Sequence, residues 1–216
     1  MEHHMLVVAT RNRGKSAEIR KFLAEFPVEI KDLNDFGPLP EIIEDGATFE
    51  ENAYKKASFT AKILGLPALA DDSGLEVRAL DGEPGVHSAR YAGPNATDAD
   101  NNAKLLQAME SAADRRARFV CVLSLAVPTG AALTYEAACE GVILEAPRGE
   151  NGFGYDPLFF HPPTGKSFAE MSLEEKAEVS HRGQAMQDLN SEFEKVMIWL
   201  KRRLDEERLL RGDHIC

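Results

Sequence analysis

Two short acidic segments combine carboxylates with turn-forming residues in a way that suits a metal ion. One is Glu44-Asp45-Gly46, and the other is Asp71-Asp72-Ser73-Gly74, a polar loop expected after the apolar strand 66–70. Oxygen ligands on short loops suit Mg2+, which commonly takes one or two carboxylates beside substrate phosphates. Because side chains alternate along a strand, Asp71 and Asp72 cannot face the same way, and we expect one to bind metal and the other to brace the loop. The plainer alternative is an ordinary turn, for which Asp-Ser-Gly is common.

A basic loop near the start of the chain suits a polyphosphate. It comprises Thr10, Arg11, Asn12, Arg13, Gly14 and Lys15, and it lies between an apolar run and an amphipathic pattern. A glycine-containing turn at a helix N-terminus exposes N–H groups and the positive end of the helix dipole, and the cationic side chains add charge. A solvated turn is the alternative. A sharper rival is a P-loop kinase or ATPase, because residues 9–16 read A-x-x-x-x-G-K-S, with alanine in place of the first glycine.

Two further groups of residues indicate a nucleotide site only when they are considered together with the acidic segments and the basic loop. One lies on a predicted helix, and the other is split between two segments. Asn52 and Lys56 are spaced i, i+4 on one predicted helix face, from which a lysine can reach phosphate. The segment Phe153-Gly154-Tyr155-Asp156 sets aromatic rings among glycines, where they can lie flat against a base. Lys176 and His181-Arg182 offer donors for base carbonyl oxygens. In the plainer interpretation the rings fill the core, the His-Arg pair caps a helix and Lys56 is solvated.

The elements that position these groups alternate between strand and helix. Met5–Ala9 is a short apolar run, and the basic loop leads from it into an amphipathic helix. Thr48 opens a second helix with capping-box spacing, and that helix ends before Gly65. The other expected elements are a helix at 99–112, a hairpin of strands 119–127 and 133–139, and a long terminal helix from Met186. We expect an α/β fold, with a twisted mixed sheet, helices on its faces, and two lobes.

Composition narrows the class of protein. The 216 residues are 44% hydrophobic and 28% charged, the balance of an ordinary globular chain. A formal charge of -11 disfavours general nucleic-acid binding, and no apolar run reaches the roughly 18 residues of a membrane span. Cys121, Cys139 and Cys216 show no zinc or disulfide pattern. We expect a cytoplasmic protein without a nucleic-acid or membrane partner, whose residues 1–4 are a leader or cloning remnant.

Six motifs lie in order along most of the chain, namely ATRNRGK, FEENAYKKA, LADDSGLEV, PGVHSARYAG, GFGYDPLFF and EEKAEVSHRG. In this order they resemble the inosine/xanthosine triphosphate pyrophosphatases, the Ham1-like family. The resemblance implies an elongated α/β fold with a substrate cleft between two lobes, usually in a homodimer. It also implies magnesium-assisted hydrolysis of ITP, dITP or XTP to the monophosphate and pyrophosphate, which cleanses the nucleotide pool. We expect one pyrophosphatase domain over residues 5–205 and an extension over 206–216, beyond the family's usual end.

Carried over motif by motif, the resemblance assigns roles to individual residues. Thr10 to Lys15 would hold the triphosphate with help from Lys56, and Glu44 and Asp72 would bind Mg2+. Asp72 would also be the general base, and Ser73 would touch substrate. The base pocket would comprise Phe153, Gly154, Tyr155, Asp156, Lys176, His181 and Arg182. Asp45 and Asp71 remain alternatives to Glu44 as the second metal ligand.

Three other kinds of function remain open beside this one. They are the P-loop enzyme, a non-catalytic nucleotide-binding module, and a related pyrophosphatase for pyrimidine or methylated nucleotides. A P-loop enzyme would leave the GFGYDP and SHRG motifs unexplained. A binding module would need the phosphate loop but no carboxylate pair. The cluster of Lys176 and His181-Arg182 favours a purine.

Overall fold

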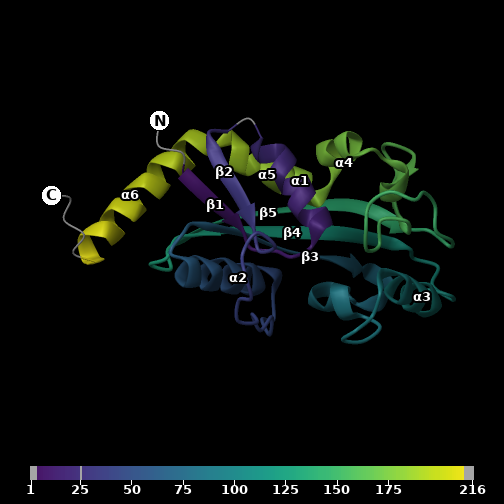
Figure 1. Ribbon diagram of the computed structural model, residues 1–216. Coiled ribbons are helices and arrows are strands. Elements are labelled where there is room, and N and C mark those ends of the chain that lie inside the picture. The colour runs from purple at the N-terminus through teal and green to yellow at the C-terminus, as the bar shows by residue number, and fades with distance from the viewer. Residues whose placement is uncertain (1–3, 25, 212–216) are drawn as a thin grey trace. The chain divides into compact units, whose positions relative to one another are not determined.

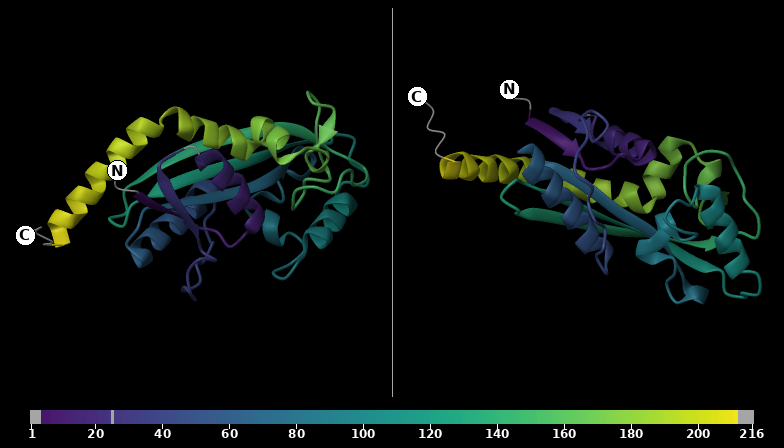
Figure 2. Two further views of the ribbon diagram at one scale, coloured as in Figure 1. Left: turned by 45° about the horizontal axis from the view of Figure 1, so that its top comes forward. Right: turned by 60° about the horizontal axis from the view of Figure 1, so that its bottom comes forward.

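The chain folds around one mixed β-sheet flanked by helices (Figure 1 and Figure 2). The computed structural model describes residues 4–24 and 26–211, and within them seven strands follow the order β2-β1-β3-β4-β5-β6-β7. β1 (His4–Val8) is parallel to β2 (Val28–Asp32) and to β3 (Ala68–Val77). β6 (Phe159–His161) is antiparallel to β5 (Ala132–Ile143), and β7 (Lys166–Ser167) is antiparallel to β6. The predicted α/β class and mixed sheet are confirmed.

The chain divides into two compact units, which correspond to the predicted lobes. Unit 1 comprises Met1–Asp72, Val122–Tyr135 and Ala185–Cys216, and unit 2 comprises Ser73–Cys121 and Glu136–Gln184. The boundaries fall inside β3, β4 (Arg116–Ala126) and β5. Each of these strands therefore contributes one part to each unit.

Helix α2 (Phe49–Leu64) packs on the strands of unit 1 through small side chains. Thr48 caps its N-terminus by accepting a hydrogen bond from a backbone N–H one turn along, and Gly65 ends it in the left-handed conformation with φ 66°. Glycine adopts this conformation without steric cost, so the predicted limits of the helix are confirmed. Ala57 lies in one buried apolar cluster with Val7 of β1 and Ala70 of β3. The close packing brings the polar residues of α2 to the middle of β3.

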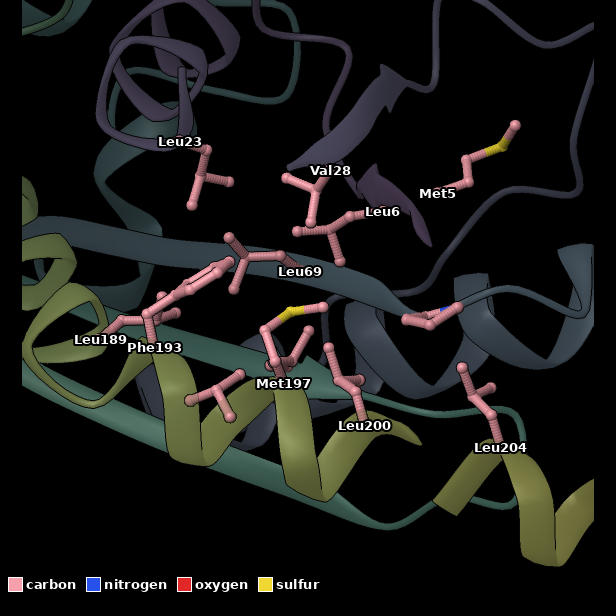
Figure 3. Close-up of a pocket in the computed structure, with 13 residues that line it drawn as sticks. Met5, Leu6, Leu23, Val28, Leu69, Leu189, Phe193, Met197, Leu200 and Leu204 are labelled. Atoms are coloured by element: carbon pink, nitrogen blue, oxygen red, sulfur yellow. The ribbon is translucent and has the colours of Figure 1, made fainter. Parts of the chain in front are cut away.

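Helices α1 (Arg13–Leu23) and α6 (Phe193–Arg211) pack on the side chains of β1 and β3 that point away from α2. Leu6 of β1 and Leu69 of β3 alternate with the residues that face α2 and line a small apolar cavity of about 20 Å3. Figure 3 shows Leu200 of α6 and Leu6 and Leu69 turned toward the same space. Unit 1 is thus a three-layer arrangement of helix, sheet and helix, the usual solution for parallel strands buried on both faces.

The terminal helix is interrupted, contrary to the single long helix predicted from Met186. α5 (His181–Ser191) ends just before Glu192, whose N–H donates to Leu189 O at 3.2 Å in a tighter turn. Phe193 then opens α6, and its ring stacks on Phe26 with centroids 3.5 Å apart. α6 continues to Arg211, past the expected domain limit at 205. In the described part of the chain, no helix is long and apolar enough to cross a membrane.

Unit 2 is organised around buried aromatic rings. Phe119 of β4, Phe159 of β6 and Phe168 belong to one core cluster, in which the Phe159 ring lies 4.7 Å by centroid from each of the other two. α3 (Asp98–Ala108), which ends four residues before the expected limit, and α4 (Leu173–Val179) also belong to this unit, as does the first turn of α5. The expected loop at 82–95 contains a 3-10 helix, Gly85–Arg90.

The strand expected to end at Ala70 instead continues to Val77, so the polar loop predicted at 71–74 is wrong. Charged side chains normally end a buried strand, but here Asp71 and Asp72 each meet a lysine and stay in the sheet. The predicted hairpin is confirmed, because β4 and β5 are neighbours in the sheet and Val127 N donates to Ala131 O at 3.0 Å across the turn.

The tryptophan and the buried cysteines lie in different units. The single tryptophan, Trp199, lies on α6 in unit 1, whereas the buried Cys121 and Cys139 lie in unit 2. Burial raises the pKa of the Cys139 thiol to about 12, so it stays protonated near neutral pH. Cys216, residues 1–3 of the expected leader and residues 212–216 of the expected extension lie outside the described residues.

Candidate active site

The basic loop connects β1 to α1, as predicted, and its own polar side chains fix it. Asn12 is the N-cap of α1, and its side chain accepts a hydrogen bond from Lys15 N at 3.0 Å. Asn12 N donates to Thr10 Oγ1 at 3.1 Å. Gly14 and Lys15 lie in the first helical turn. The positive end of the helix dipole therefore coincides with the cationic side chains of the loop, an arrangement that favours an anion.

The three cations of this loop have different surroundings. Arg11 Nη1 donates to Leu33 O at 2.9 Å, which joins the loop to the turn after β2. Arg13 is exposed. Lys15 forms an ion pair with Asp71 of β3, and 17% of the Lys15 side chain remains exposed. Lys15 therefore has an internal counter-ion while its side chain still reaches solvent.

Local geometry counts against the P-loop alternative. Gly14 lies inside α1, so only residues 9–12 separate β1 from the helix and could wrap a phosphate. Ser16, whose hydroxyl would face the metal in a P-loop, donates to Asp32 Oδ2 at 2.5 Å. That hydroxyl ties α1 to the end of β2. The P-loop interpretation is not supported.

The paired aspartates face opposite sides of β3, as alternation predicts. Asp71 turns toward α1 and Lys15, and Asp72 turns toward α2, where its Oδ1 lies 2.5 Å from Lys56 Nζ. Glu44 Oε2 approaches the same ammonium at 3.2 Å. The side chains of Asp72 and Lys56 are both only 9% exposed. Asn52, one turn before Lys56 on α2, accepts from Gly46 N at 2.8 Å and so fixes the loop that carries Glu44.

Glu44 and Asp45 separate in the structure, although they are consecutive in the sequence. Asp45 Oδ1 pairs with Lys55 Nζ at 2.6 Å, and its side chain is 69% exposed. Glu44 is the member that turns toward Lys56 and Asp72. Of the carboxylates that the sequence left open, Glu44 is therefore the one placed beside Asp72, while Asp45 and Asp71 are each engaged with another lysine.

Burial and charge act against each other at this carboxylate cluster. Burial alone would lower the pKa of Lys56, but the carboxylates of Asp72 and Glu44 outweigh it and raise that pKa. Burial raises the pKa of Asp72, and the nearby ammonium groups of Lys56 and Lys15 only partly offset it. A carboxylate whose pKa is raised toward neutrality is a better proton acceptor, as a general base requires.

The donor set fits a magnesium ion that is shared with substrate. Within the described residues, no group of three or more Asp, Glu, His or Cys side chains is arranged to hold a metal. The two carboxylates of Glu44 and Asp72 do converge on one cation, the Lys56 ammonium. Mg2+ commonly takes one or two carboxylates and completes its shell with waters and phosphate oxygens. A pair of carboxylates therefore suits this ion, although it would not form an all-protein cage.

Unit 2 brings together most of the residues predicted for the base pocket. Lys176 Nζ of α4 lies 2.6 Å from Asp156 Oδ2, and both side chains are almost fully buried. The same ammonium lies 4.8 Å from the centre of the Phe153 ring. Asp156 Oδ2 also accepts from Phe153 N at 2.9 Å. A Cβ at Gly152, where φ is 76°, would lie 2.0 Å from this oxygen, so the turn requires glycine.

Arg182 and His181 open α5 and are buried in unit 2. Arg182 Nη2 donates to Ser73 Oγ at 2.8 Å, and its guanidinium carbon lies 5.7 Å from the Phe153 ring centre. Ser73 is thus placed beside a residue predicted for the base pocket. The His181 ring stacks on Phe119, with centroids 4.6 Å apart and planes inclined by 11°. His181 is therefore packed on the aromatic core as well as placed next to Arg182.

Tyr155 and Gly154 have structural contacts. Tyr155 belongs to the buried core of unit 2, and its hydroxyl donates to Ser88 O at 2.9 Å. Burial raises the pKa of Tyr155, which keeps the phenol neutral. Gly154 N donates to Asp98 Oδ2 at 2.7 Å, and Gly154 O accepts from Asn102 Nδ2 at 2.9 Å. These bonds tie the 153–156 segment to α3.

Three residues outside the predicted site hold these side chains in place. The sequence singled out Asp71 and Asn52 without giving these contacts, and it missed Asp32. Asp71 pairs with Lys15. Asn52 accepts a hydrogen bond from Gly46 N, and Asp32 accepts one from Ser16 Oγ. Strand alternation could have paired Asp71 with α1, and the spacing of Asn52 from Lys56 placed both on one face of α2. Nothing in the sequence marks Asp32, because its partners come from a different element.

Known proteins resemble this chain over most of its length. A family model described as the Ham1 family matches residues 6–192. A dITP/XTP pyrophosphatase of Syntrophobacter fumaroxidans is 70% identical over 212 residues, which cover 98% of this chain and 91% of that protein. A dITP/XTP pyrophosphatase of Thermus thermophilus is 58% identical over 187 residues, which cover 85% of this chain and 89% of that protein.

Solved structures of similar proteins share the fold. The structure of a HAM1 protein from Coxiella burnetii matches with a TM-score of 0.82 and 44% identity, over 89% of this chain and 99% of that one. The Staphylococcus aureus Ham1 protein matches with a TM-score of 0.79 and 43% identity, over 88% of this chain and 98% of that one.

Proposed function

The chain belongs to the Ham1 family, and from that premise we propose that it hydrolyses non-standard purine nucleoside triphosphates, namely ITP, dITP and XTP, to the monophosphate and pyrophosphate. Its relatives are named dITP/XTP pyrophosphatases. The observation that carries the proposal is the convergence of the Asp72 and Glu44 carboxylates on the Lys56 ammonium. The residue before Asp72 on β3, Asp71, pairs with Lys15. The activity removes these nucleotides from the precursor pool.

The proposed reaction is a single hydrolytic step at the α-phosphorus. Asp72 accepts a proton from the attacking water while the water oxygen bonds to the α-phosphorus. The bond from the α-phosphorus to the oxygen that bridges the α- and β-phosphates breaks. The electron pair leaves with pyrophosphate. Glu44 and Asp72 would hold Mg2+, which would neutralise charge on the triphosphate and on the leaving pyrophosphate. Lys15, Lys56 and the N-terminus of α1 stabilise the negative charge that grows on the leaving group.

Unit 2 supplies the proposed recognition of the base. Inosine and xanthosine carry an O6 acceptor where adenosine carries an amino donor. The buried cations Lys176 and Arg182 both lie near the Phe153 ring, so their donors and the ring face could bind one base together. Adenine would leave such a donor without an acceptor, which costs free energy in a buried site.

Product analysis with a panel of nucleotides tests the proposal. With dITP and Mg2+, chromatography should show dIMP and pyrophosphate from the earliest times, with XTP also hydrolysed and dATP and dUTP much slower. Appearance of dIDP and orthophosphate would refute cleavage next to the α-phosphate. Faster hydrolysis of dUTP than of dITP would instead support the pyrimidine-directed alternative. Chelation of the metal should stop turnover if Glu44 and Asp72 hold Mg2+.

Assembly as a homodimer and a cytoplasmic location are further proposals. The homodimer rests on the resemblance of the chain to its family, and the cytoplasmic location rests on the composition of the sequence. Neither one changes the roles proposed for the side chains above.

A further inference from the structure

Strand β3 supplies a buried carboxylate to each of the two lysines proposed to bind phosphate. Asp72 and Lys56 pair on the α2 side, and Asp71 and Lys15 pair on the α1 side. Asp72 has a proposed chemical role, whereas Asp71 has none. Its side chain is 0% exposed, although that of Lys15 is 17% exposed, so the acid lies beneath the lysine.

Two separate contacts hold Lys15 at its place. Its backbone N–H donates to the N-cap Asn12 at 3.0 Å, which fixes the start of its side chain in the first turn of α1. Its ammonium is held at the other end by Asp71. The pair therefore determines where the charge of Lys15 lies along the loop.

A carboxylate is more than positioning requires. A neutral acceptor of the same shape could also take a hydrogen bond from the ammonium, whereas a buried charge needs a partner and is costly to leave without one. The negative charge also weakens the attraction between Lys15 and any phosphate. The costs of a buried charge and of weaker phosphate binding are offset if the Asp71 charge assists product release. When a phosphate product leaves, the Lys15 ammonium can return to Asp71 and still has a counter-ion.

We propose that Asp71 is a positioning residue that acts through Lys15, and that its charge limits how tightly the product pyrophosphate is retained. The inference rests on the proposed function, since pyrophosphate is the product only if cleavage occurs next to the α-phosphate. Lys15 shares its charge between Asp71 and the phosphates, and it returns fully to Asp71 as pyrophosphate leaves. Release of product sets the turnover rate of many enzymes, so a moderated cation at this position raises kcat.

The test is the affinity of Asp71→Asn for pyrophosphate, measured by titration calorimetry in the presence of Mg2+. Asparagine keeps the acceptor and the shape but removes the charge. Its Kd for pyrophosphate should fall at least about tenfold, because Lys15 no longer shares its charge with a carboxylate and a charge interaction at short range in a partly buried site is worth at least that much. In turnover, kcat and KM for dITP should fall together, because release becomes slower. A Kd that rises or does not change would overturn the inference.

A second background shows whether Asp71 acts through Lys15. In Lys15→Met, pyrophosphate should bind more weakly than in the parent, and adding Asp71→Asn should leave that Kd unchanged. Tighter binding on addition of Asp71→Asn to Lys15→Met would mean that Asp71 acts by another route, and would overturn the inference. Asp71→Ser also removes the charge and replaces Asp71→Asn if that variant does not fold.

Failure of the proposed function gives a different result. A parent protein that neither hydrolyses dITP nor binds pyrophosphate with Mg2+ would refute the function and the inference together. A parent that does both, with an unchanged Kd in Asp71→Asn, would refute only the role of Asp71.

Discussion

Asp72 is the residue with the most demanding proposed role, because it would bind metal and accept the proton of the attacking water. Asp72→Asn keeps the shape of the side chain and removes its charge. We expect kcat to fall by about 10²–10⁴-fold from loss of the base, with loss of metal adding to this. Initial rates of pyrophosphate release from dITP measure the effect, and thermal unfolding verifies the fold.

Asp45→Asn is the matched control for this change. Asp45 is adjacent to Glu44 in sequence but pairs with the exposed Lys55, so its loss should leave the rate within a few-fold of the parent. If Asp72→Asn retained a comparable rate, Asp72 could be neither the base nor an essential metal ligand.

Arg182 is the residue expected to discriminate between bases. Arg182→Ala should lower kcat/KM for dITP more than for dATP and compress the ratio between them roughly tenfold or more, because the donor proposed to bind O6 is lost. Arg182→Lys keeps a cation if the alanine variant is unstable. Arg148→Ala, an exposed arginine of the same unit paired with Glu170, should leave the ratio unchanged. An equal fall for both nucleotides would assign Arg182 to structure or phosphate binding.

The sequence indicated the chemistry of these residues better than it indicated their contacts. Lys15, Glu44, Lys56 and Asp72 could be assigned to one part of the site by motif, but their pairing depends on which face of β3 each approaches. For Tyr155, the core alternative considered from the sequence matches its buried position. Burial of a ring depends on side chains from other elements, which a local motif does not specify.

At the scale of elements, Asp32 joins β2 to the helix that carries Lys15. Its carboxylate accepts from Ser16 Oγ at 2.5 Å and from Arg20 Nη2 at 3.1 Å, both on α1. Burial would raise the pKa of Asp32, but these bonds and one from Asn34 outweigh it and lower the pKa below the ordinary 3.8. The ionised form is therefore the one that stabilises the fold.

Asp32→Asn should reduce stability in a manner that depends on pH. Because the folded pKa lies below the unfolded value, the stabilisation is fully present above the unfolded pKa, near 3.8, and is lost as the pH falls through the folded pKa. At pH 7 the variant should lose about 1.5–3 kcal/mol of unfolding free energy, the range for hydrogen bonds to a charged group. Urea unfolding should show that difference shrink below about pH 4. Glu29→Gln, an exposed acid on β2, is the control, and an equal loss for Asp32→Asn at both pH values would contradict the account.

Element limits were predictable where a local signal fixed them. Thr48 and Gly65 marked both ends of α2, because a cap and a left-handed glycine act within one turn. The end of β3 was not predictable in this way, since Asp71 and Asp72 remain in the strand only because lysines from two separate helices meet them. The break at Glu192 likewise accompanies a contact with Phe26, far away in the sequence.

At the scale of the whole molecule, we predict a homodimer. Light scattering at micromolar concentration should give a mass near twice the 23.8 kDa of one chain. Symmetric dimers are the commonest oligomers, and the family resemblance favours one here. A mass of one chain across this concentration range would contradict the prediction without affecting the chemistry proposed for either unit.

The unequal placement of tryptophan and cysteine gives the chain two natural reporters. Fluorescence of Trp199 monitors unit 1, while reaction of Cys121 and Cys139 with a thiol reagent requires unit 2 to open. A Cys216→Ser background confines the labelling to the two buried thiols. Because β3, β4 and β5 each belong to both units, we expect the fluorescence change and the onset of labelling to coincide along a denaturant series. Labelling that preceded the fluorescence change would mean that unit 2 opens before unit 1 unfolds. The native side chains of the protein can therefore report, without an introduced dye, whether its two units unfold together.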